Sequence, residues 1–170
     1  MKYTRLLSFV MIILIFSGCS HMEISESKNI ETTIDKEIEE LHKNQPLFTK
    51  TKDEFHTAVM RINGIESVNV QKGAMRKYKF NHANIQIDVF FNMIYTDKIA
   101  YLIFTLPSKQ STSEDDAKKI ASVSSILIPE INDGEIMEAM AEEGTQNFKT
   151  YSVQTEFVST DLILTLTPHS

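Results

Sequence analysis

The spacing of apolar residues changes its period along the chain, and the first period predicts a pair of helices. Apolar residues recur at helical spacing over Ile30–Leu41, with acidic side chains mostly on the opposite face. Pro46 ends any continuation of that helix. A second helix is expected to begin at Thr51, because Thr51 and Glu54 have the spacing of a capping box. Asn63-Gly64 then offers the left-handed conformation that commonly closes a helix.

From Ile65 onward the period becomes two, which predicts strands. Ile65–Val70 and Met75–Phe80 flank the glycine-containing loop Lys72-Gly73-Ala74, which predicts a hairpin. The clearest alternation covers Asn84–Tyr95, where every second side chain is apolar. The next stretch, Ile99–Leu106, is apolar on both faces, which is typical of a central strand.

Helical spacing then returns. Ser113 is a good N-cap followed by three acidic residues, where negative charge favours the helix dipole. The apolar stripe that follows consists of Ala117, Ile120, Ala121, Ser124, Leu127 and Ile128. Pro129 and the cluster Asn132-Asp133-Gly134 break or kink the helix. Asp133 can cap a shorter helix through Glu143, with Ile136, Met137 and Met140 facing inward.

The chain closes with a second predicted hairpin, in which Phe148–Val158 pairs with Leu162–Thr167. The expected order is therefore α-α-β-β-β-β-α-α-β-β. This order predicts an α+β fold with an antiparallel sheet of about six strands and helices packed on one face.

The first residues have a different character. Met1–Arg5 carries two positive charges, Leu6–Phe16 is almost wholly apolar, and Ser17-Gly18 supplies two small residues before Cys19. A basic start, a short apolar run and a small-residue cleavage site are typical of a secretory signal. The apolar run is about half the length of a membrane-spanning helix, which needs roughly 20 residues.

Phe16-Ser17-Gly18-Cys19 resembles the lipobox of bacterial lipoproteins, although leucine is usual where Phe16 stands. The resemblance implies a diacylglyceryl group on the Cys19 thiol, cleavage before Cys19 and, often, acylation of the new amino terminus by a fatty acid such as palmitate. The alternative is an ordinary signal peptide whose cysteine is accidental. Cys19 is the only cysteine, so it cannot form an internal disulfide, and a lipid on the thiol explains its presence in an exported protein.

These observations divide the chain into a signal peptide over 1–18, an acylated cysteine with a polar tether over 19–29, and a single α+β domain over 30–170. The resemblance to lipoproteins implies that the protein is located in the bacterial cell envelope. With Ser20 rather than aspartate after the anchor, the outer membrane is expected in a host with two membranes. In a host with one membrane, the outer face of the cell membrane is expected.

Charge restricts the partners. The 17 basic and 23 acidic residues give a net charge of −6. Loss of Lys2 and Arg5 with the signal leaves 15 basic residues and a net charge of −8. Such a body is repelled by phosphate backbones, so nucleic acid is disfavoured. The expected partners are the lipid bilayer, through acylated Cys19, and another envelope protein.

Candidate chemistry is sparse. The five histidines do not have the spacing of a helical zinc site, and there is neither a nucleophile elbow nor a phosphate-binding glycine loop. Asn132-Asp133-Gly134-Glu135 lacks the ligands of a calcium loop, which favours a helix cap. The sequence assigns no catalytic, cofactor-binding or metal-binding residue; lipidation at Cys19 is the one predicted site.

Two surface features leave alternatives open. Met137 and Met140 fill the core or line an adaptable groove. Arg76, Lys77 and Lys79 are explained by a solvated edge strand protected by lysine, or by contact with an anionic partner.

Two classes of function follow. The first is a non-enzymatic binding or accessory module held at an envelope membrane. The second is an envelope enzyme, for example a hydrolase, whose site is assembled only in three dimensions. A polar pocket that brings together two or more of Asp88, His56, His82 and Glu156 would favour the enzyme.

Overall fold

The structure is a computed structural model, and it describes residues 36–68, 75–107 and 113–169. The chain forms two compact units, Met1–Ile38 and Glu39–Ser170. The signal peptide, Cys19, the tether and the predicted loop at 72–74 lie outside the described residues, so these predictions stay untested. Of the first predicted helix, over 30–41, residues 36–41 are described and are helical, and the helix continues to residue 44.

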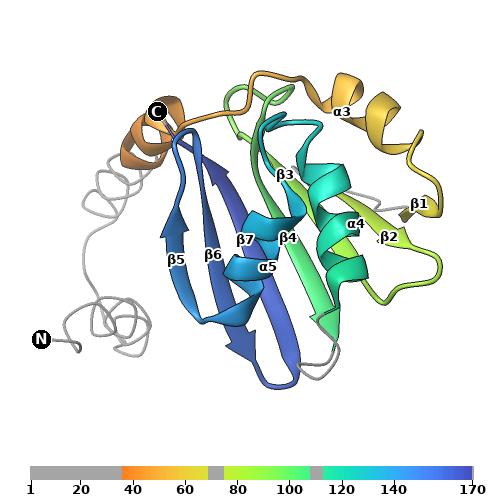
Figure 1. Ribbon diagram of the computed structural model, residues 1–170. Helices are drawn as coiled ribbons and strands as arrows, with labels where there is room; N and C mark the ends of the chain where they lie inside the picture. The colour runs from red at the N-terminus through yellow and green to blue at the C-terminus, as the bar shows by residue number, and fades with distance from the viewer. Residues whose placement is uncertain (1–35, 69–74, 108–112, 170) are drawn as a thin grey trace, which may run out of the picture. The chain divides into compact units, whose positions relative to one another are not determined.

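The second unit contains a seven-stranded antiparallel sheet whose strand order is β1-β2-β3-β4-β7-β6-β5 (Figure 1). The strands are β1 (Ile65–Val68), β2 (Met75–Phe80), β3 (Gln86–Phe91), β4 (Ile99–Pro107), β5 (Gly144–Asn147), β6 (Tyr151–Val158) and β7 (Asp161–Pro168). The labelled helices are α3 (Lys52–Val59), α4 (Glu114–Ser124) and α5 (Asp133–Ala141). The α+β class and the antiparallel sheet are confirmed. The count of six strands and the stated order are wrong, because β5 lies between α5 and β6.

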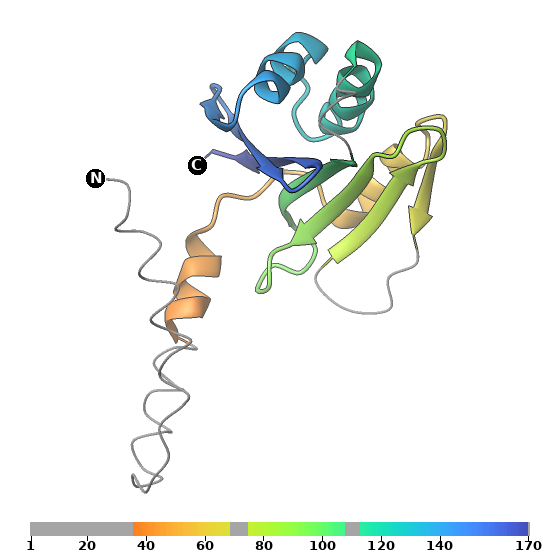
Figure 2. The same ribbon diagram turned by 90° about the horizontal axis from the view of Figure 1, so that it is seen from below.

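The labelled helices pack on the same face of this sheet. Strand pairing places one row of side chains across five strands, namely Tyr78, Ile87, Phe104, Leu164 and Thr155. At one end of the row the Phe55 ring of α3 meets the Tyr78 ring edge-on, with centroids 6.1 Å apart. At the other end the Thr155 hydroxyl donates to the Ala139 carbonyl of α5 at 2.7 Å. We call this side of the sheet the covered face; Figure 2 shows α4 and α5 above it.

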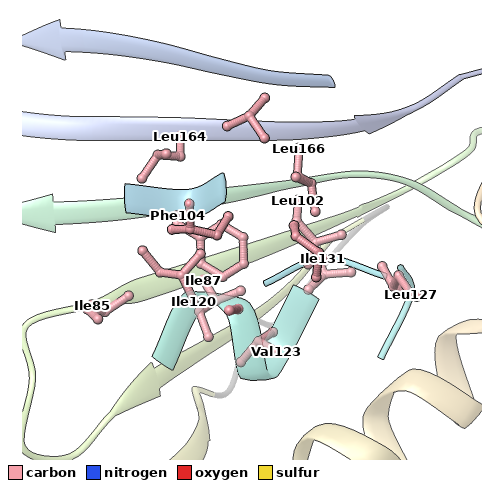
Figure 3. Packing of buried hydrophobic residues seen from close by; sticks show 14 of the residues in the cluster. Ile85, Ile87, Leu102, Phe104, Ile120, Val123, Leu127, Ile131, Leu164 and Leu166 are labelled. Atoms are coloured by element: carbon pink, nitrogen blue, oxygen red, sulfur yellow. The ribbon is translucent and has the colours of Figure 1, made fainter. Parts of the chain in front are cut away.

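The covered face holds the main hydrophobic core. Its strand residues are buried: Tyr78, Phe80, Ile87, Val89, Leu102, Phe104, Leu106, Tyr151, Val153, Leu162, Leu164 and Leu166. The α4 residues Ile120 and Val123 lie against this layer, near Ile87 and Phe104 (Figure 3). Removing this much apolar surface from water is the main stabilising contribution available to a domain without disulfides.

Capping explains where two helices begin, as predicted. The Thr51 hydroxyl accepts from the Glu54 amide, and the Glu54 carboxylate accepts from the Thr51 amide at 2.8 Å. Ser113 and Asp116 form the same reciprocal arrangement at the start of α4. Gly64 has a φ of +81°, so the left-handed turn after α3 is confirmed.

The prediction for α5 needs correction. Asn132, rather than Asp133, is the N-cap, because its side chain accepts from the Glu135 amide. The helix ends at Ala141 instead of Glu143. Met140 is buried as expected, whereas Met137 is exposed, so the inward orientation is wrong for Met137.

The predicted strand over Asn84–Tyr95 is too long at both ends. In the structure β3 begins at Gln86 and ends at Phe91. Asn92 stops the strand because its side-chain oxygen accepts from the Ile94 and Tyr95 amides, which turns the chain. The central position of β4 is confirmed, since it pairs with β3 on one side and β7 on the other.

Candidate functional site

The side of the sheet opposite α3, α4 and α5 is not covered by these helices. Register places its side chains in rows, for example Lys77, Asp88, Ile103, Thr165 and Gln154. We call this side the open face. Its residues, none of them buried, are Met75, Lys77, Lys79, Gln86, Asp88, Phe90, Tyr101, Ile103, Thr105, Ser152, Gln154, Glu156, Ile163, Thr165 and Thr167.

An apolar patch occupies the middle of the open face. Phe90 of β3 and Tyr101 of β4 are directly paired, and their rings stack with centroids 4.5 Å apart and planes 16° apart. Ile103 and Ile163 extend the patch along β4 and onto β7, and all four side chains are partly exposed. Partial burial raises the pKa of the Tyr101 hydroxyl above its ordinary value. We call Phe90, Tyr101, Ile103 and Ile163 the open-face patch.

Polar groups border the patch. On one side Lys77 pairs with Asp88 at 3.4 Å, and the Gln86 amide donates to the same carboxylate at 3.1 Å. On the other side the Gln154 amide donates to Glu156 at 2.6 Å. An apolar centre with a polar border is the arrangement found in protein–protein interfaces.

The basic cluster Arg76, Lys77 and Lys79 does not lie on an edge strand, so that interpretation is wrong. Strand β2 lies between β1 and β3. Each cation pairs with a carboxylate: Arg76 with Asp53 at 3.1 Å, Lys77 with Asp88, and Lys79 with Glu66 at 2.6 Å. Their charges are largely neutralised within the domain, which weakens the alternative of an anionic partner.

The four residues expected to mark an enzyme lie apart. His56, on α3, has its Nδ1 atom 3.0 Å from the hydroxyl of Tyr78 on the covered face. Burial raises the pKa of this tyrosine. Asp88 and Glu156 share the open face but lie on β3 and β6, with β4 and β7 between them. His82 follows β2. Among the described residues, no hydrogen bond or ion pair joins any two of these four.

Two shallow hollows flank the turn between β2 and β3. One, of about 500 Å³, is bordered by Glu66, Lys79 and Gln86 among others. The second, of about 320 Å³, is bordered by His82, Asp115, Asp116 and Lys119 among others. Lys119 is paired with Asp115, and Asp116 belongs to the α4 capping box. The polar groups around the second hollow are therefore committed mostly to α4 itself.

A second exposed apolar feature lies at the opposite end of β3. Met93, Ile94 and Tyr95 are 63%, 39% and 43% exposed. Asn92, fully buried just before them, holds this turn by accepting from the Ile94 and Tyr95 amides at 2.8 and 2.9 Å. Its amide group also donates to the His42 carbonyl at 2.7 Å. We call Met93-Ile94-Tyr95 the apolar tip.

Sequence reasoning missed both surfaces, although one signal for the open-face patch was present. The apolar character of β4 on both sides correctly predicted a central strand. The same pattern also places Tyr101 and Ile103 on the side opposite the core. The apolar tip gave no separate signal, because Met93 and Tyr95 continue the alternation of β3.

Within the described ranges, no group of three or more His, Cys, Asp or Glu side chains could hold a metal ion. The same ranges contain no helix that is long and apolar enough to cross a membrane. Comparison with protein-family models, with curated proteins and with solved structures finds no significant match. The class is thus defined by the fold alone: an α+β domain with an open antiparallel sheet and one face left free of its labelled helices.

Proposed function

We propose that this protein is a lipid-anchored lipoprotein of the bacterial envelope whose domain is a non-enzymatic binding module. Cys19 carries the lipid, and the open face of the sheet meets another envelope protein. In a host with two membranes the anchor lies in the outer membrane. In a host with one membrane it lies in the outer face of that membrane.

The observation that carries the binding role is the open-face patch. A solvated sheet face needs only polar and small side chains, whereas this one presents a stacked aromatic pair and two isoleucines inside a polar border. Aromatic residues at the centre of a surface, with charged residues at its rim, favour a protein partner. The short outer strands β1 and β5, four residues each, offer little edge for strand addition, so the face is the better candidate.

The anchor is supported by the sequence alone and has its own test. Cells grown with labelled palmitate are expected to incorporate label into the wild-type protein and none into Cys19→Ser. Equal labelling of the variant would contradict acylation at this thiol.

The binding role is tested by site-specific crosslinking in intact cells. A photoreactive residue at Ile103 is expected to capture one defined envelope protein, and Tyr101→Glu in the same chain is expected to abolish the capture. A photoreactive residue at Met137, which is exposed on α5 over the covered face, is the control. Capture of the same protein from both positions, or capture that survives Tyr101→Glu, would contradict a site on the open face.

A further inference from the structure

The apolar tip is held rigidly in its exposed position. The Asn92 side chain is fully buried, and its oxygen fixes two successive backbone amides, those of Ile94 and Tyr95. The chain is also closed behind the tip, because the Lys98 amide donates to the Tyr95 carbonyl at 2.8 Å. A large apolar side chain that is both exposed and preorganised indicates a contact surface rather than a loosely packed loop.

The tip lies beside the point where the chain enters the domain. The Asn92 amide group donates to the His42 carbonyl, at the end of the helical residues 36–44. The segment that follows residue 44 pairs with the chain just after the tip. The Phe48 amide donates to the Ile99 carbonyl, and the Lys52 amide donates to the Asp97 carbonyl. Leu41, immediately before His42, is 72% exposed. The chain that leads back toward Cys19 therefore leaves the domain next to the tip.

This proximity limits the distance between the tip and an anchored Cys19. Twenty-two positions separate Cys19 from Leu41. Even fully extended, a chain of that length spans at most about 75 Å. Counted along the chain, the end of the sheet that carries the tip is the end nearer to Cys19, so it is the end that a lipid at Cys19 would bring toward the bilayer.

We propose that the apolar tip inserts into the interface of the lipid bilayer and orients the domain on the membrane; this inference rests on the proposed anchor at Cys19. Met93 and Ile94 supply apolar surface for the acyl region. Tyr95 has an apolar ring and a polar hydroxyl, which suits it to the headgroup level. The loop carries one charge of each sign, Asp97 and Lys98, so it lacks the net repulsion of the acidic body.

A lipid surface fits the tip better than a protein surface does. Three consecutive residues on a turn form a narrow protrusion, whereas a specific protein interface buries about 800 Å² on each partner. A bilayer needs no complementary pocket, and each apolar side chain that enters it adds to the binding free energy through its own buried area.

The chain offers a matched control at the opposite end of the sheet. Val158 is 51% exposed and precedes the turn between β6 and β7. Asp161, in β7, pairs with Pro107, the last residue of β4, whereas the tip precedes Ile99, the first. An exposed apolar residue in or next to a turn is thus present at both ends of the sheet, but only one end adjoins the point where the chain enters the domain.

The test uses tryptophan, which the chain lacks. Ile94→Trp and Val158→Trp are introduced separately into the mature chain, Cys19–Ser170. Each protein is coupled through its single thiol to a maleimide lipid in phosphatidylcholine vesicles, with or without brominated acyl chains. We expect the Ile94→Trp emission to shift to shorter wavelength on coupling and to be quenched at least twofold more strongly by brominated lipid than that of Val158→Trp. Equal quenching of the two variants, or an Ile94→Trp emission unchanged by coupling, would overturn the inference.

The two proposals fail separately in this design. Chemical coupling supplies the anchor, so absence of a tip-specific signal refutes membrane insertion whatever happens in cells. Absence of palmitate on the wild-type protein refutes the cellular anchor without affecting the fluorescence result. Circular dichroism of each variant before coupling establishes that both are folded.

Discussion

The covered and open faces of the same sheet differ in burial although both are formed by strands β2, β3, β4, β6 and β7. On β7, Leu164 is buried beneath the helices, and its neighbour Ile163 is only partly buried on the other side. On β4, Phe104 and Ile103 show the same contrast. The difference teaches that apolar alternation identifies the face that helices cover, while apolar residues out of phase with it indicate a surface with a use other than the core.

The largest effect is expected when two adjacent residues of equal size, one on each face, are shortened to alanine. Leu164→Ala is expected to lower the free energy of unfolding by about 2–5 kcal/mol, because it opens a cavity in a packed core. Ile163→Ala is expected to lower it by less than about 1 kcal/mol, because water already reaches the side chain. Urea denaturation of both variants measures the two values. A loss for Ile163→Ala as large as that for Leu164→Ala would mean that the open face is packed after all.

The end of β3 allows a second test, because there the alternation continues in sequence but not in structure. Asn92→Ala removes the acceptor for two amides and the donor to His42 from a fully buried position. We expect a loss of about 2–3 kcal/mol in the free energy of unfolding. Met93 is the next residue, and its side chain is exposed. Met93→Ala is therefore expected to change the free energy of unfolding by no more than about 0.5 kcal/mol. Similar losses for the two variants would show that the tip is not held by Asn92.

The same region shows what the sequence could and could not predict. Capping at Thr51 and Ser113 was predictable because all partners lie within three residues of each other. The turn at Asn92 was not, because Met93 and Tyr95 fit the period of a strand and the distant partner, His42, is invisible to a local pattern. Strand β5 was missed because Gly144–Asn147 contains no apolar residue and is defined only by its pairing with β6.

The candidate surfaces were harder to predict than the elements. The open-face patch combines residues of β3, β4 and β7, and only strand register brings Phe90, Tyr101 and Ile163 onto one side. The pairing of β4 with β7 joins residues about 60 positions apart in the sequence, beyond the reach of any periodicity.

Alkaline pH provides a third test, since tyrosines with a raised pKa lie on both faces: Tyr78 and Tyr151 on the covered face and Tyr101 on the open face. For Tyr151, on the covered face, the main cause is burial, followed by its hydrogen bond to Glu135 at 2.8 Å. For Tyr101, on the open face, the cause is burial alone. The unfolded chain therefore loses these protons first as the pH rises above about 10, and the folded state loses stability there.

We expect the free energy of unfolding to fall with pH above about 10, and Tyr151→Phe to remove more of this slope than Tyr101→Phe. Urea denaturation at several pH values between 7 and 11 measures the slope, which separates titration from the hydrogen bond that Tyr151→Phe also loses at neutral pH. A slope unchanged by Tyr151→Phe, or reduced more by Tyr101→Phe, would contradict the assignment of the deeper tyrosine to the covered face.

The smallest expected effect concerns one hydroxyl in the layer that covers the sheet. Ser124, the last residue of α4, is fully buried, and its hydroxyl has no hydrogen-bond partner among the described residues. Ser124→Ala removes an unsatisfied polar group, so it is expected to raise the free energy of unfolding by up to about 1 kcal/mol. Ser122→Ala is the control, because Ser122 is exposed on the same helix and shares the gain in helix propensity, while it loses only an exposed hydrogen bond from its hydroxyl to the Lys119 carbonyl. Thermal unfolding of the two variants compares them. If Ser124→Ala stabilises the protein no more than Ser122→Ala does, the buried hydroxyl does not destabilise the folded state. Water would then reach this hydroxyl inside the layer that covers the sheet.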